Sequence, residues 1–473
     1  MPSNKGIRPS AVSLILLLFI SAICFGYIHS HNKNLYENLY YGYTDLVYFE
    51  QSLANFIHGH GLINTGRGED RSLFCEHAYF THFLVSLPVY WLFPQTLTLF
   101  DLATIHMLAA LIIIFYLARR ILKNTGLAWV CYLLFLLNSY LIVCAGCFWP
   151  YGFHSDVYYL AYFLALIYFW DRNKGLAVLF FCLALLTKET HAIPLFVTML
   201  YFSIRDRGQR RTPLILAAVS LLYFLSVTEF TNLCFGGEKI AYHYYGLHLD
   251  AGRAFDSLRF PKIFFRYWKG VLIHFHFLPL LTPQVLILAL PNSLVNTLAE
   301  FTMGYSFPAR PSNWHSIPVY GFMIWAYLLS FDRLTKLIKK RGLVYSFSLV
   351  LISFSIYLLL GSPLGDLTHY RSNKKRLATV KKAEQLTAGS ESLCVARGLA
   401  APFMHKRVLC RFPVNYRKTE YILCRPSDAN LKKIRGIRYK VVMKRNHLIL
   451  LKNLSYEKRR SPPDSPSDSV IFR

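Results

Sequence analysis

Long apolar runs recur along the chain and are separated by short polar segments. They cover residues 11–28, 97–118, 126–145, 156–171, 174–188, 191–204, 213–234, 268–282, 284–299, 316–331 and 343–361. A helix needs about 20 mostly apolar residues to cross a bilayer, with a lower limit near 17. The pattern therefore predicts a mainly α, polytopic transmembrane protein with about eleven spans.

Two apolar runs need separate interpretation. The run at 83–93 is too short to span, so we expect an interfacial or re-entrant helix there. The run at 11–28 follows Lys5 and Arg8 and has the look of a signal peptide, but no A-x-A cleavage site follows it. Because further spans come after it, we expect a retained first transmembrane helix.

The basic residues predict an orientation. The chain has 52 Lys and Arg against 25 Asp and Glu, a net charge of +27. With the N-terminus in the cytoplasm and 83–93 not counted as a span, the basic clusters at 119–123, 172–174, 205–211 and 333–341 all fall on the cytoplasmic side. The charge thus fits short loops and anionic lipid, and no nucleic-acid partner is expected.

The character of the chain changes after Leu360. Residues 366–455 are polar and basic, with short alternating strands around 421–423 and 441–443. We therefore divide the chain into a transmembrane domain at 1–362, a small extracytoplasmic α/β domain at 363–455 and a Ser- and Pro-rich, disordered tail at 456–473. The first extracytoplasmic loop covers 29–96.

Carboxylates and histidines gather in the loops that this orientation places outside. Ionisable groups beside a bilayer are functional-site candidates by default. The candidates are Asp45, Glu50, His58, His60, His82, His154, Asp156, Lys188, Glu189 and His315. If they serve one function, they must converge in a single cavity on the extracytoplasmic side.

Each candidate also has a structural interpretation. Asp45 either caps a helix or acts chemically, and His58 and His60 flank Gly59 at what could be a helix end. Lys188 and Glu189 form an ion pair at a membrane boundary, or Lys188 meets a lipid phosphate. Glu76, His77 and His82 are either solvated loop residues or ligands of a divalent cation, Mg or Mn.

Several short motifs resemble one family of membrane proteins. They are Asp45-Leu46 with Phe49 and Gln51, His58-Gly59-His60-Gly61-Leu62, His82-Phe83, Tyr116-Leu117-Ala118-Arg119-Arg120, Phe153-His154, Leu186-Thr187-Lys188-Glu189, His315-Ser316, and Pro402, His405, Arg407 and Phe412-Pro413. At these residues the chain resembles the uncharacterised family called domain of unknown function 2079. That family in turn resembles the GT-C glycosyltransferases, which use polyprenyl-phosphate sugars.

Four positions depart from the family pattern. Val47 stands in place of Gly, Leu84-Val85 in place of Ser-Pro, Ser155-Asp156 in place of Pro-Glu, and Trp314 in place of Tyr. The change to Asp156 keeps the carboxylate.

The resemblance implies an integral enzyme of the cell (inner) membrane. Asp45 would be the catalytic base that deprotonates an acceptor on the extracytoplasmic side, because transfer with inversion needs a carboxylate opposite the leaving group. The other nine candidates would bind substrate, and a cation or a basic side chain would receive the leaving phosphate. The partners implied are membrane lipid, a polyprenyl-phosphate sugar donor and an acceptor that the sequence does not name.

Two other classes of function stay open. A polytopic transporter or lipid flippase also has many spans, although it usually places ionisable residues near the midplane and shows an internal repeat. The chain shows no such repeat, and its charged groups gather on one face. The family departures also leave room for an inactive, GT-C-like assembly protein.

Overall fold

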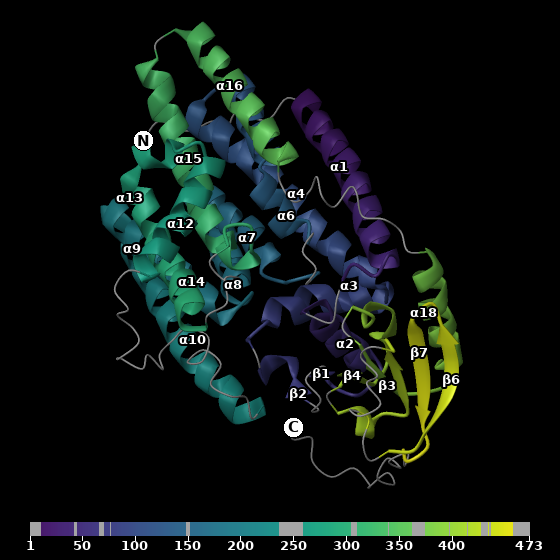
Figure 1. Ribbon diagram of the computed structural model, residues 1–473. Coiled ribbons are helices and arrows are strands. Elements are labelled where there is room, and N and C mark those ends of the chain that lie inside the picture. The colour runs from purple at the N-terminus through teal and green to yellow at the C-terminus, as the bar shows by residue number, and fades with distance from the viewer. Residues whose placement is uncertain are drawn as a thin grey trace.

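The computed structural model describes residues 11–41, 45–65, 71–75, 77–147, 152–235, 259–303, 310–338, 340–361, 374–396, 398–413, 415–426, 434 and 437–456. Most of them form a bundle of helices, and a small mixed sheet follows near the C-terminus (Figure 1). The disordered tail expected at 456–473 lies almost wholly outside the described residues.

The helices of the bundle follow the apolar runs closely. They are α1 (Ala11–Glu37), α4 (Thr96–Leu122), α5 (Thr125–Leu136), α6 (Ser139–Ala145), α7 (Val157–Phe169), α8 (Lys174–Leu185), α9 (Ala192–Arg205), α10 (Arg211–Phe235), α12 (Arg259–His274), α13 (Pro283–Leu286), α14 (Leu290–Met303), α15 (Ile317–Leu337) and α16 (Arg341–Leu360). The short run at 83–93 becomes the π-helical turn η2 (His82–Ser86) and the helix α3 (Leu87–Leu92).

Asparagine side chains fix several helix starts. Asn124, Asn138 and Asn173 each accept a hydrogen bond from the backbone N–H three residues later, as N-caps of α5, α6 and α8. The cap at Asn138 divides the predicted run 126–145 into two helices, because a capping residue leaves helical geometry. The long apolar stretch is therefore divided where the side chain of Asn138 caps the next helix.

Helices α7 and α15 form the centre of the bundle. The side chains of α7 are buried from Val157 through Ile167, and α7 contacts α4, α8 and α15. At Gly321 of α15, a Cβ atom would lie 2.5 Å from the ring of Phe163 in α7. The absent side chain lets the two helices approach closely, as small residues do between membrane helices.

Within the described residues, four helices are long and apolar enough to cross a bilayer: Ala11–Glu37, Thr96–Leu122, Arg211–Thr231 and Gly342–Leu360. Shorter apolar helices lie at His82–Leu92, Thr125–Leu136, Val157–Phe169 and Lys174–Leu185. A helix of 13 residues such as α7 is about 20 Å long, less than a hydrocarbon core of about 30 Å. The eleven spans expected from the sequence therefore stay a prediction.

The C-terminal part combines a helix and a five-stranded sheet. Helix α18 (Lys374–Leu386) precedes β3 (Ser392–Val395), β4 (Val408–Arg411), β5 (Tyr421–Cys424), β6 (Tyr439–Arg445) and β7 (Leu448–Asn453). The strand order is β4-β3-β5-β7-β6, parallel in the first three strands and antiparallel in the rest. The strands predicted around 421–423 and 441–443 lie within β5 and β6.

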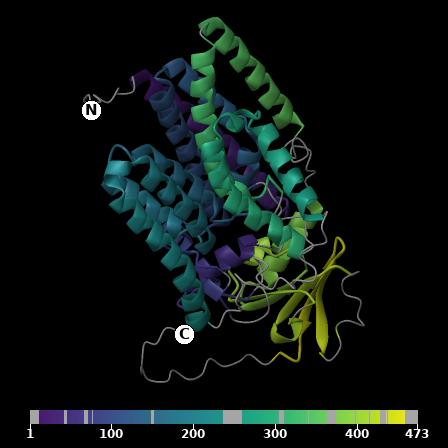
Figure 2. The same ribbon diagram turned by 90° about the vertical axis from the view of Figure 1, so that its left-hand side faces the viewer.

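The sheet lies at one end of the bundle, beside the segment that follows α1. That segment contains α2 (Asp45–Ile57) and the short strands β1 (Ile63–Asn64) and β2 (Arg71–Ser72). Figures 1 and 2 place the starts of α1 and α16 at the opposite end. The architecture thus gathers the first loop and the C-terminal sheet on one side.

Candidate functional site

The start of helix α2 packs against the loop before α7. Gly152 has a φ of +75°, and a Cβ atom there would lie 2.8 Å from Leu46. Only glycine combines this backbone geometry with so close an approach. The contact sets Asp45, the half-buried first residue of α2, beside the loop that carries His154 and Asp156.

Phe49, one helical turn after Asp45, lies in a buried box of rings. Its ring centroid is 5.1 Å from that of His154, 4.9 Å from that of Tyr79 and 4.8 Å from that of His82. Residues four apart share one face of a helix, so Asp45 and Phe49 point toward the same side of α2. The imidazole of His82 donates to the carbonyl of Phe49 at 3.4 Å.

Asp156 is the centre of a buried polar cluster. One carboxylate oxygen forms an ion-pair contact with Nδ1 of His154. The other lies 3.2 Å from Nε2 of His191 and 3.6 Å from the ammonium of Lys188. All four side chains are less than one-tenth exposed. We call this set, His154, Asp156, Lys188 and His191, the Asp156 cluster.

His154 is held neutral in this cluster. Burial lowers the pKa of His154 to about 4, although the carboxylate of Asp156 opposes the shift. A neutral imidazole that donates from Nδ1 keeps a lone pair on Nε2. The Tyr79 hydroxyl lies 3.5 Å from this nitrogen. Nδ1 of His154 thus faces the Asp156 carboxylate, and Nε2 faces a hydroxyl group.

Glu189 joins the cluster to the first loop. Its carboxylate accepts from Nδ1 of His77 at 2.6 Å and from the backbone N–H of Ala78 at 2.9 Å. Burial raises the pKa of Glu189, but His77, Lys188 and the Ala78 N–H outweigh it and lower that pKa to about 2. A permanent carboxylate therefore ties the segment after α8 to the residues before η2.

His315, in the turn before α15, lies beside the Asp156 cluster. Its neighbour Trp314 stacks on His154, with ring centroids 4.6 Å apart, and its own ring lies 6.4 Å from His154. Asn296 of α14 donates to the carbonyl of His315 at 2.9 Å. A small cavity adjoins both Asp156 and His315. It is lined by Asp156, Thr190, His191, Asn292, Val295, Asn296, His315 and Pro318.

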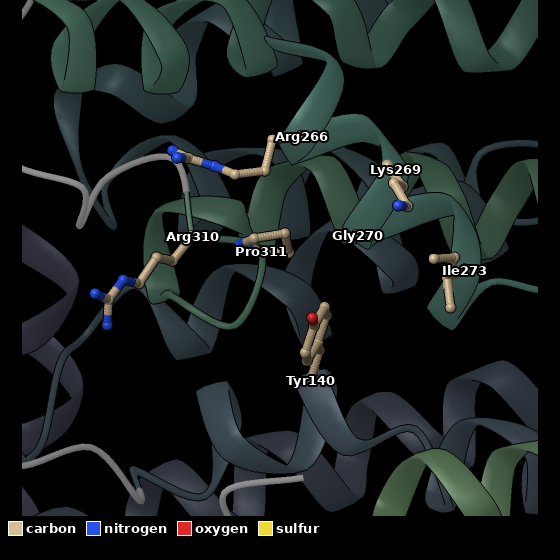
Figure 3. Close-up of a pocket in the computed structure, with 7 residues that line it drawn as sticks. All are labelled: Tyr140, Arg266, Lys269, Gly270, Ile273, Arg310 and Pro311. Atoms are coloured by element: carbon tan, nitrogen blue, oxygen red, sulfur yellow. The ribbon is translucent and has the colours of Figure 1, made fainter. Parts of the chain in front are cut away.

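A larger, cationic pocket is lined in part by Arg310 and Pro311, just before His315 in the chain. It has a volume of about 620 Å³ and is lined by Tyr140, Arg266, Lys269, Gly270, Ile273, Arg310 and Pro311. Figure 3 shows Tyr140 of α6 across the opening from Arg266 and Lys269 of α12. Among the described residues no acidic side chain lines it, although Arg266 also pairs with Glu300.

The backbone connects this pocket to the Asp156 cluster. The carbonyl of Arg310 accepts from the N–H of Asn313 at 3.0 Å and from the Ser316 hydroxyl at 3.3 Å. Asn313 in turn caps the 3₁₀ turn η7 (Trp314–Ser316). The loop that supplies Arg310 to the pocket therefore also holds His315 beside His154.

Three sequence candidates lie elsewhere. Glu50 points away from Phe49, and its carboxylate accepts from Tyr90 at 3.1 Å and Thr96 at 2.9 Å. Burial raises the pKa of Glu50 to about 8, against these two hydrogen bonds. His58 and His60 lie at the other end of α2, about 20 Å along the helix from Asp45. Both histidines follow the end of α2 at Ile57, as the structural interpretation of these residues expected.

Other residues of the site were not among the candidates. His191 follows Lys188 by three residues, a spacing that brings both to one side of a helical turn. Tyr79 gave no separate signal, because aromatic residues are abundant throughout the chain, and Trp314 was marked only as a departure from the family pattern. Their roles depend on contacts across the bundle that only the fold creates.

The cation site considered for Mg or Mn stays a prediction. Within the described parts of the chain, no group of three or more His, Cys, Asp or Glu residues is arranged to hold a metal ion. Both oxygens of Asp156 contact His154, His191 or Lys188, and both oxygens of Glu189 accept hydrogen bonds. Glu76, one of the residues considered for a metal, lies outside the described residues.

The fold is that of a mainly helical membrane protein with several apolar helices and a small C-terminal sheet. The structure is similar to the crystal structure of ArnT from Cupriavidus metallidurans bound to undecaprenyl phosphate, with a TM-score of 0.56 and 13% identity over 94% of this chain and 98% of that chain. The apo structure of the same ArnT gives a TM-score of 0.54 and 14% identity over 94% and 99%.

The chain belongs to the family of predicted membrane proteins named DUF2079. The family model matches residues 35–450, which includes most of the first loop, the bundle after α1 and most of the C-terminal sheet. No curated protein matches the sequence. The family membership implied by the short motifs is thereby confirmed.

Proposed function

We propose that this protein is an integral membrane glycosyltransferase that moves a sugar from a polyprenyl-phosphate donor to an acceptor. The observation that carries the proposal is the convergence of the Asp156 cluster, His315 and the start of α2 from segments far apart in the sequence. The similarity of the fold to an ArnT structure that holds undecaprenyl phosphate supports it.

Asp45 is the proposed base. It would take the proton of the acceptor hydroxyl while that oxygen bonds to the anomeric carbon of the sugar. The bond from that carbon to the phosphate oxygen breaks, and the phosphate leaves with the electron pair. The half-buried position of Asp45 at the start of α2, beside the buried loop of His154, suits this role.

The cationic pocket is the proposed place of the donor phosphate. Arg266, Lys269 and Arg310 offer positive charge to an anion, and a charge that develops on the leaving phosphate is stabilised by such groups. Lys188 and His154 would instead bind sugar hydroxyls near the base, since both already contact Asp156. The loop from Arg310 to His315 links the two parts.

The proposed reaction takes place on the extracytoplasmic side of the cell membrane. The positive-inside rule supports this orientation, with a cytoplasmic N-terminus. The C-terminal sheet lies at the same end of the bundle as α2 and would face the acceptor. No step is assigned to a metal ion.

Transfer of labelled sugar from polyprenyl phosphate by the purified protein in lipid nanodiscs tests the proposal. Asp45→Asn should lower kcat by about 10²- to 10⁴-fold, because a positioned base contributes a factor of this size. Asp332→Asn, which changes a carboxylate paired with the exposed Lys336, is the matched control and should keep full activity.

Two results would contradict the proposal. Undiminished turnover by Asp45→Asn removes Asp45 from the mechanism. Absence of transfer by the wild-type protein, together with counterflow of a solute in proteoliposomes, would favour a transporter instead.

A further inference from the structure

The C-terminal sheet is joined to helix α2 by a buried group of hydrogen bonds. Gln51 of α2 donates from Nε2 to the Thr65 hydroxyl and to the carbonyl of Lys406, both at 3.0 Å. The side-chain carbonyl of Gln51 accepts from the backbone N–H of Thr65 at 3.0 Å. Gln51 and Thr65 are 0% and 3% exposed, so no solvent replaces these bonds when they are lost.

Thr65 occupies the free edge of the sheet. Its hydroxyl donates to the carbonyl of Leu409 at 3.0 Å and accepts from the N–H of the same residue at 2.7 Å. Leu409 belongs to β4, an edge strand whose outer polar groups need a partner. One side chain thus takes the place of a neighbouring strand.

Two further residues hold the same contact. Asn55, one turn after Gln51 in α2, donates to the carbonyls of Ile63 and Arg407 at 2.8 and 3.4 Å. The ammonium of Lys406 is buried against the carbonyls of Thr387 and Ser390 at the end of α18, at 2.5 and 2.8 Å. The segment 406–409 is therefore anchored on one side to α18 and on the other to α2.

Helix α2 leads from this contact to the site. Asp45 lies six residues before Gln51, about 9 Å along the axis, and Phe49 lies between them. Phe49 packs on His154 and Tyr79. A helix of 13 residues moves as one body, so a shift of Gln51 against the sheet shifts Asp45 against the Asp156 cluster.

We infer that Gln51 and Thr65 are positioning residues that set helix α2, and with it Asp45, against the Asp156 cluster by holding α2 to strand β4 of the C-terminal domain. The inference rests on the proposed function for its catalytic consequence. This gives the C-terminal domain a defined role. It fixes the distance between Asp45 and the Asp156 cluster, although it contributes neither.

The test compares two matched variants of the full-length protein in nanodiscs. Thr65→Val keeps the shape of the side chain and removes the hydroxyl, whereas Thr65→Ser keeps the hydroxyl. Hydrogen exchange is measured for amides of α2 and of α7, together with kcat and the KM for the labelled donor. Exchange reports the coupling even if no sugar is transferred.

For Thr65→Val we expect exchange in α2 to rise about tenfold with α7 unchanged, since a buried donor and acceptor lose their partner. We expect kcat to fall about tenfold or more with the donor KM within about twofold, and Thr65→Ser to restore both. The inference is overturned if α2 exchange does not change, if exchange rises while kcat stays at the wild-type value, or if Thr65→Ser behaves like Thr65→Val. A wild-type protein without transfer activity overturns the proposed function, and the exchange result then decides the coupling alone.

Discussion

The ion pair between Asp156 and Lys188 shows how one buried charge depends on another. The ammonium lies 3.6 Å from the carboxylate, and both side chains are at most 2% exposed. A buried charge without its partner is strongly unfavourable, because desolvation is then uncompensated. The cluster is consequently sensitive to the loss of any single charge.

Asp156→Asn should therefore destabilise the folded protein by about 3–5 kcal/mol, because the buried Lys188 loses the carboxylate that lies 3.6 Å from its ammonium. Thermal unfolding in nanodiscs measures this as a lower Tm. Asp332→Asn breaks the solvent-exposed pair with Lys336 and should lower stability by no more than about 1 kcal/mol. The double variant Asp156→Asn, Lys188→Met should recover part of the loss. An equal Tm for Asp156→Asn and Asp332→Asn would refute this account.

Glu50 predicts a pH dependence of stability. Its pKa is raised from 4.5 to about 8 in the folded state, so between these values the folded protein keeps a proton that the unfolded chain has released. The free energy of unfolding should then fall as pH rises through this window, by up to about 1.4 kcal/mol per pH unit.

Unfolding temperatures measured from pH 5 to pH 8 test this slope. Glu50→Gln should flatten it, because glutamine keeps the shape and does not titrate. Glu391→Gln is the control, since that side chain is 61% exposed and lies 3.6 Å from Arg407. If Glu50→Gln and wild type lose stability in parallel over the window, Glu50 is not the group that titrates.

At the scale of elements, the sequence predicted most helices to within a few residues. Apolar runs predicted α4, α7, α9 and α16, because a helix buried in lipid and a helix buried in the bundle are both mostly apolar. The start of α12 at Arg259 was missed, since Arg259, Lys262 and Arg266 interrupt the apolar run in its first turns. The break at Asn138 was also missed, because it depends on a helix N-cap and the mean hydropathy of the segment does not reveal caps.

The site was predictable in part for a similar reason. The sequence singled out His154, Asp156 and Lys188 as ionisable residues beside apolar runs, and the structure brings them together. It could not show that Glu50 turns to Tyr90 and Thr96, because the sequence does not determine which side of α2 faces the site. That choice is made by packing across the bundle.

Helix α12 carries a prediction of its own. Lys269→Ala should raise the KM for the polyprenyl-phosphate donor about tenfold with a smaller effect on kcat, because a phosphate contact made in both ground and transition state changes affinity. Lys262→Ala is the matched control, an exposed lysine on the same helix outside the pocket. Equal KM values for the two variants would place the phosphate elsewhere.

For the whole molecule, the predicted orientation is open to a direct measurement. A cysteine in place of the exposed Lys382 of α18 should react with a membrane-impermeant maleimide added to intact cells. A cysteine in place of the exposed Lys336 at the end of α15 should react only after the membrane is opened. The reverse pattern would invert the topology and place Asp45 in the cytoplasm.

The bond between Thr65 and Leu409 also has a consequence for biogenesis. The two residues are 344 positions apart, so a ribosome that adds 5–20 residues per second needs roughly 20–70 s to reach the second after the first. During that interval Gln51 and Thr65 have no strand to bind. Helix α2 can therefore bind β4 only when synthesis is nearly finished. A polypeptide that ends before β4 would lack the contact that positions Asp45.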